Sequence, residues 1–123
     1  DDRHSWGLDG ARSLKWFGGD SAWDVDWKQG DTLGFAADFE ANQLLFGLNG
    51  KWSVGFEDVQ WPEGGCIYPA LTGNCRAQPL VVRANFGERN WKHGPPEGDA
   101  FSAFRPQEPE GQELPLVARR FFN

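Results

Sequence analysis

Two carboxylates, Asp38 and Glu40, have the spacing in this sequence that comes nearest to a catalytic pattern. On one β-strand, residues two apart point the same way, and the strand rise would set these carboxylates about 6–7 Å apart. Paired carboxylates at such separations are what glycosidases use. The pair also stands at the end of an expected strand, next to Asn42, where acids are common because they are solvated. We therefore interpret both acids as structural and keep a carbohydrate-binding or glycosidase-like β-sandwich as the alternative.

The other reactive residue types lack the spacing that their chemistry needs. His4 and His93 have no second His, Cys or Asp at metal-ligand spacing. Ser5 and Ser53 lack the G-x-S-x-G elbow of a nucleophile, and the glycines at 18–19 are not followed by the Lys of a phosphate-binding loop. We predict a protein that is not an enzyme and that has no metal site and no cofactor.

The two cysteines, Cys66 and Cys75, flank an expected strand. A strand of that length would hold their Cα atoms beyond the ~7 Å limit of a disulfide unless the chain turns back. Two reduced thiols are therefore expected, with a bridge as the alternative. The sequence also has no N-x-S/T acceptor, which favours an intracellular protein. The compartment itself stays unknown, and a processed organellar form remains open.

The composition favours one all-β domain. The 123 residues include seven Trp, ten Phe, 16 Gly and eight Pro, which suits short strands and many turns. A net charge of −6 argues against a nucleic-acid partner and against an anionic membrane surface. No apolar run approaches the ~20 residues of a membrane span, so we expect a soluble protein without direct membrane insertion. The absence of Met predicts a processed form or a piece of a longer protein.

The stretch from Trp27 to Lys51 organises the expected elements. Period-two alternation predicts strands at 32–38 and 43–48, and Asn49-Gly50 predicts a tight turn into a third strand at 53–59. Further strands are expected at 5–8, 14–17, 67–72 and 80–86, with an ordered loop at 20–29. No window shows a convincing helical period, so little or no helix is expected.

The texture of the chain changes after Gly87. The segments 94–98 and 105–111 are rich in Pro, Glu and Gly, and they are not expected to pack a core. Residues 114–122 are apolar again, and they either fold back onto the domain as a last strand or dock on a partner. Fold-back is favoured, because apolar segments are seldom left in water. We divide the chain into a β-sandwich at 1–104 and a linker with an apolar end at 105–123.

The tryptophans divide by their position in these elements. Those at strand ends, where a large ring usually fills a core, are interpreted as structural: Trp6, Trp16, Trp27 and Trp52. Those in expected loops, where binding surfaces are often built, are Trp23, Trp61 and Trp91. Each of these three is more simply explained by packing beneath its own loop.

Five motifs in a fixed order carry a family resemblance. W-x-x-G-D-x-L-G-x-x-x-D followed by L-x-F-x-L-N-G-K resembles the middle of a SPRY domain. The segments S-W-G-L-D-G, G-F, Y-P-A and N-F-G agree in order between Ser5 and Phe104. The resemblance implies an all-β fold, an antiparallel β-sandwich of the concanavalin-like kind. The strands that usually open such a domain, before S-W-G, are absent from this sequence.

The resemblance also implies a function and a surface. SPRY relatives bind peptide segments or folded partners through the loops before the S-W-G strand and after the Y-P strand. By position, the partner-binding residues are Arg3, His4, Thr72, Gly73, Asn74 and Arg76. We therefore expect a non-catalytic protein–protein interaction module, a scaffold or accessory part of a larger protein or hetero-complex. Its missing strands would be replaced by further residues of the same polypeptide, by the C-terminal segment or by a neighbouring subunit.

Overall fold

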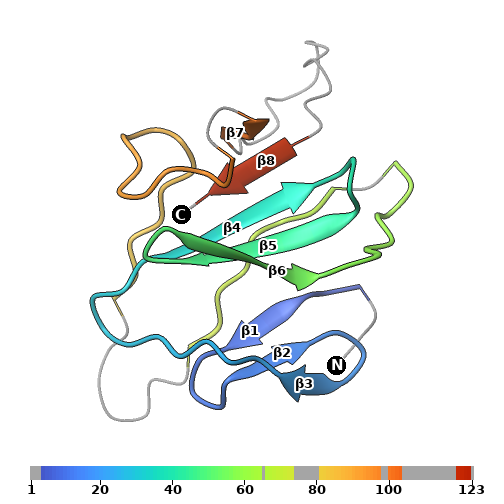
Figure 1. Cartoon of the computed structure of the whole chain (residues 1–123), viewed down its shortest axis with the longest axis horizontal. Coiled ribbons are helices and arrows are strands. Elements are labelled where there is room, and N and C mark those ends of the chain that lie inside the picture. Colours follow the sequence, from blue (N-terminus) through green and yellow to red (C-terminus); the bar gives the residue numbers. More distant parts are fainter. Residues whose placement is uncertain (1–3, 65, 74–80, 98–99, 104–118, 123) are drawn as a thin grey trace.

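The computed structural model describes residues 4–64, 66–73, 81–97, 100–103 and 119–122, which form two β-sheets (Figure 1). The first sheet has the order β1-β2-β3, with β1 (Gly7–Asp9), β2 (Leu14–Trp16) and β3 (Asp20–Ala22). The second has the order β6-β5-β4-β8-β7, with β4 (Leu33–Asp38), β5 (Gln43–Leu48), β6 (Lys51–Phe56), β7 (Ser102–Ala103) and β8 (Arg119–Phe122). Neighbouring strands are antiparallel except β7 and β8, and the described residues contain no α-helix. The predicted all-β class is confirmed, whereas the sandwich stays a prediction.

The β4-β5-β6 meander confirms the expected central strands. Leu33 pairs with Leu48 and Asp38 with Gln43, so the alternation of the sequence sets the register of β4 and β5. Asn49 (φ 51°) and Gly50 (φ 85°) both adopt positive φ, as a two-residue type I′ turn requires. Because that turn places Lys51 directly opposite Leu48, β6 begins at Lys51, two residues earlier than predicted.

One face of the meander meets the three-stranded sheet through aromatic rings. The Trp23 and Phe46 rings lie 5.9 Å apart, and the Phe17 and Phe56 rings lie 6.4 Å apart, both edge to face. Lys15 of β2 donates a hydrogen bond from Nζ to the carbonyl of Gly55 at 2.8 Å, with its charge near the Phe56 ring. These contacts hold the first sheet against the β6 side of the second, as Figure 1 shows.

The opposite face of the meander is covered by the segment after Gly87. The Trp52 ring lies flat over Gly34 and Gly47, and its Nε1 donates a hydrogen bond to the Gly94 carbonyl at 3.0 Å. Pro96 is buried, and Phe101 packs with Ala36 in the core beside Trp52. The prediction that 94–98 packs no core is therefore wrong for its described part. The Trp52 ring is an apolar surface that is stabilised by burial. The segment after Gly87 covers this ring and also provides the Gly94 carbonyl as acceptor for its Nε1 hydrogen bond.

The first three strands confirm one expectation and correct another. The expected hairpin at β1 and β2 forms, and Asp9 Oδ1 in its turn accepts hydrogen bonds from the Ala11 and Arg12 amides. The Arg12 side chain also donates to the Asp9 carboxylate, which lowers the pKa of Asp9 below its ordinary value. Residues 20–22, expected in a loop, instead form β3. A Gly18-Gly19 turn returns the chain onto β2, which supplies the pairing that local pattern cannot show.

Two expected strands are absent, and one uncertain segment is settled. The described residues of 67–72 and 80–86 form no strand, although their composition suits one. A strand requires a neighbour for its backbone groups, and no described strand lies in pairing register with them. The described part of the apolar end, residues 119–122, folds back, since β8 pairs with β4 through Phe35↔Phe122 to Asp38↔Arg119, whereas residues 114–118 lie outside the described residues. The linker at 105–111 lies outside the described residues.

Candidate functional site

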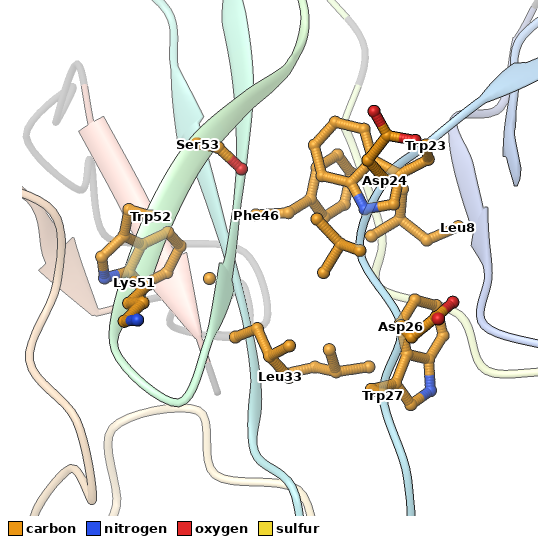
Figure 2. Close-up of a pocket in the computed structure, with 13 residues that line it drawn as sticks. Leu8, Trp23, Asp24, Asp26, Trp27, Leu33, Phe46, Lys51, Trp52 and Ser53 are labelled. Carbon is orange, nitrogen blue, oxygen red and sulfur yellow. The ribbon is translucent and has the colours of Figure 1, made fainter. Parts of the chain in front are cut away.

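A groove of about 330 Å³ lies between the two sheets (Figure 2). One wall is the irregular segment 23–27 together with Leu8 of β1, and the other is the start of β6 at 51–53. Leu33, Phe46 and Leu48 of the meander form its apolar floor. The groove exists because β6 ends its sheet on this side while the chain from β3 to β4 passes across from it.

The polar groups of the groove stand on its walls. Asp24 and Asp26 lie on one wall and Lys51 on the other, as Figure 2 shows. Asp26 accepts a hydrogen bond from the Ser13 hydroxyl, whereas exposed Asp24 has no hydrogen bond or ion pair with any described residue. The Trp23 side chain is 8% exposed, and its Nε1 is buried without a hydrogen-bond partner among the described residues. The groove is therefore apolar below and predominantly acidic along one wall.

A second feature is a pair of exposed apolar segments, residues 67–73 and 81–84, which we call the open segments. Their side chains include the most exposed large apolar groups of the described chain: Tyr68 (77%), Leu71 (67%), Val81 (90%) and Val82 (53%). No backbone–backbone hydrogen bond joins the open segments to any other described residue. The Ala84 carbonyl accepts a hydrogen bond from Arg89 Nη2 at 3.1 Å, and the other peptide groups of the open segments make no hydrogen bond with a described residue.

Cys66 stands directly before the first open segment, and its exposed thiol forms no disulfide with a described residue. Its interaction with the Tyr68 hydroxyl raises the pKa of Tyr68 above the ordinary value. Cys75 lies outside the described residues.

The surface predicted from the family resemblance is described at three of its six positions. His4, before β1, is exposed, and so are Thr72 and Gly73 in the first open segment. Arg3, Asn74 and Arg76 lie outside the described residues. The partner-binding assignment of these six residues stays a prediction, but Thr72 and Gly73 fall within the apolar surface that the structure adds.

Of the two carboxylates on which the alternative function depends, Asp38 and Glu40, the first has a structural role. Asp38 is 4% exposed, and its Oδ1 accepts hydrogen bonds from the amides of Glu40 (3.0 Å) and Ala41 (2.9 Å). It thereby closes the turn between β4 and β5, as Asp side chains often do. The expectation of solvated acids holds for exposed Glu40 and is wrong for Asp38, whose burial is made acceptable by these two donors.

The loop tryptophans pack as the simpler interpretation predicted. Trp23 is buried against Phe46, Trp61 packs against Phe39 at a tilt of 54° with ring centroids 4.6 Å apart, and Trp91 packs against the core. Among the described residues, no three His, Cys, Asp or Glu side chains cluster in a way that could hold a metal ion. The same part of the chain contains no helix long and apolar enough to cross a membrane.

The groove was missed by sequence reasoning. Its two walls, 23–27 and 51–53, are more than twenty residues apart, and the motifs that begin at Trp27 and end at Lys51 do not indicate that the walls face each other. The available clue was the mixture of acids and aromatics in 23–27, which follows no strand period and faces both a core and solvent.

No protein-family model matches the chain, and no solved structure matches it. The similarity to SPRY domains therefore rests on the sequence motifs. The function has to be argued from the groove and the open segments.

Proposed function

We propose that this chain is a non-catalytic protein-interaction module that binds its partner through the open segments. The observation that carries the proposal is the exposure of Tyr68, Leu71, Val81 and Val82 on backbone without hydrogen-bond partners in the described structure. Single exposed apolar residues are ordinary, whereas these four fall on only two short segments, and exposed apolar patches mark interaction sites. Unpaired peptide groups add a second reason, because they are stabilised when a neighbouring strand satisfies them.

The composition of the open segments points to the kind of partner. The sequences I-Y-P-A-L-T and V-V-R-A are rich in residues that favour strands, yet they form none here. The SPRY resemblance places a strand at the Y-P segment, and the residue pattern predicts one at 80–86, so both support a partner that supplies the missing neighbours. A neighbouring subunit or another part of the same polypeptide fits this requirement, which makes the chain a scaffold or accessory part of a larger protein or hetero-complex.

The carbohydrate-binding or glycosidase-like alternative has weaker support. It relied on two carboxylates beside an exposed tryptophan face. Asp38 uses its Oδ1 atom to close a turn, and neither Asp38 nor Glu40 lines the groove. The nearby Trp61 ring packs against Phe39.

The proposal predicts that charges in the open segments abolish partner capture. The double variant Leu71→Asp/Val81→Asp places two acids on the apolar surface, and we expect recovery of the partner from an extract of the native source to fall about tenfold or more. Quantitative mass spectrometry of affinity-captured material measures this. Sedimentation of the purified chain detects the case in which the partner is a second copy.

The matched control is Gln29→Asp/Gln60→Asp, which adds the same charge at exposed positions outside the open segments. Both double variants should keep the circular dichroism spectrum of the parent chain. Equal capture by the two variants would show that the open segments do not form the interface.

A further inference from the structure

The edge of the five-stranded sheet at β6 is open. β6 ends the strand order β6-β5-β4-β8-β7, and at six residues it is the longest strand at an edge of either sheet. Proteins normally blunt such an edge with short strands, prolines or charges. Near one end of β6, the Gly55 carbonyl accepts a hydrogen bond from the Lys15 side chain. The backbone groups of residues 51–54, in contrast, make no hydrogen bond to a described residue outside β5.

The type I′ turn determines which peptide groups face outward. In a two-residue hairpin the residues that flank the turn, Leu48 and Lys51, form a hydrogen-bonded pair. Hydrogen-bonded and non-hydrogen-bonded pairs then alternate, so Ser53 bonds to Phe46 while Trp52 and Val54 do not bond across the ladder. The N–H and C=O groups of Trp52 and Val54 therefore point away from β5, and the groove lies alongside residues 51–53.

The groove beside this edge is suited to alternate side chains of an added strand. Such a strand would lie on the side of β6 away from β5, and the wall of the groove opposite residues 51–53 carries the apolar Leu8 side chain, as Figure 2 shows. Asp24, exposed and without a charged partner in the described structure, stands on the opposite wall with Asp26. These acids outnumber the single cation of the groove, Lys51, and the chain carries a net charge of −6. Charge complementarity favours a basic segment.

We infer that the groove along β6 is a strand-addition site for an extended peptide segment that combines apolar with Lys or Arg side chains. Main-chain hydrogen bonds to Trp52 and Val54 supply affinity, and Leu8 and Asp24 on the opposite wall supply selectivity, as side-chain contacts do in other strand-addition complexes. The inference rests on the proposed function in that both describe protein binding. It uses different residues, however, so the two can fail separately.

A synthetic peptide tests the site on the intact chain. The probe is a capped eight-residue peptide of alternating Val and Lys, titrated by calorimetry, with a Val and Glu peptide as the charge control. Two further probes carry N-methyl groups either on every Val or on every Lys. Alternate amides of a strand face opposite edges, so one set should lose about tenfold or more in affinity and the other should bind within about threefold of the parent peptide. Equal behaviour of the two methylated peptides, or no binding of the parent peptide, would overturn strand addition.

Variants of the chain locate the site. Val54→Pro removes an outward N–H, which edge strands tolerate, and should abolish binding of the Val and Lys peptide while the chain stays folded. Ser53→Pro is its counterpart and should instead disrupt the hydrogen bonds between β6 and β5. If the Val54→Pro chain unfolds, the two methylated peptides still test whether main-chain hydrogen bonds hold the peptide.

The charge on the opposite wall is tested separately. Asp24→Lys should weaken the affinity for the Val and Lys peptide about threefold to tenfold. Glu63→Lys, the same charge change outside the groove, should leave that affinity unchanged. An unaffected Asp24→Lys would overturn the selectivity for basic segments.

The two proposals separate in one further measurement. The Leu71→Asp/Val81→Asp chain should bind the Val and Lys peptide as the parent chain does, because the open segments do not line the groove. Loss of the peptide in that variant would contradict a separate site.

Discussion

Replacing Phe46 with Ala is expected to lower the free energy of unfolding by about 3–5 kcal/mol, a large share of the 5–15 kcal/mol typical of a domain. Phe46 is 6% exposed, and its ring meets those of Trp23, Phe35 and Phe56 at centroid distances of 5.9, 5.1 and 5.9 Å. The ring also covers Gly55, where no Cβ would fit. Removal would leave a cavity at the place where the two sheets meet.

Urea unfolding followed by tryptophan fluorescence measures this loss. The control is Val54→Ala, at a residue that is 37% exposed, and it should cost less than about 1 kcal/mol. A cost below about 1 kcal/mol for Phe46→Ala would mean that the ring does not join the sheets as described.

The second large effect concerns the tryptophan that lies over glycines on the other face. A Cβ added at Gly34 would stand 2.6 Å from Cη2 of Trp52, so Gly34→Ala should cost about 1–3 kcal/mol. Trp52→Ala alone should cost about 3–5 kcal/mol, because the ring also anchors the cover through its hydrogen bond to Gly94. In the double variant the clash is gone, and the added methyl group should cost almost nothing.

A double-mutant cycle in urea therefore gives a coupling free energy of about 1–3 kcal/mol between positions 34 and 52. Gly7→Ala is the matched control, since its Cβ would meet only the Trp16 Cβ at an ordinary 3.9 Å. Strict additivity of the Gly34 and Trp52 substitutions would contradict the packing of the ring on the glycine.

The sequence predicted the meander best, for a physical reason. Leu33–Asp38 and Gln43–Leu48 alternate apolar and small or polar side chains, and the Asn49-Gly50 turn joins the second to β6, so all the information is local. β7 and β8 are two and four residues long, and each exists because a strand far away in the sequence pairs with it. Such pairings cannot be read from a short stretch.

The opposite error occurred at residues 67–72 and 80–86. Their residue types favour strands, but propensity describes how side chains suit a sheet and does not provide the neighbouring strand. The groove escaped prediction because its walls come from separate parts of the chain. The two errors have one cause, since both a strand and a groove depend on what lies beside them.

The central claim is that the open segments bind a protein partner. Hydrogen exchange measured by mass spectrometry on the purified chain, and on the complex isolated from the native source, tests it most directly. Peptides from 67–73 and 81–84 should exchange fast in the free chain, where those amides lack backbone partners, and slow down by about tenfold or more in the complex, while peptides from β4 and β5 stay protected in both. Slow exchange of these segments in the free chain, or unchanged exchange in the complex, would contradict the account.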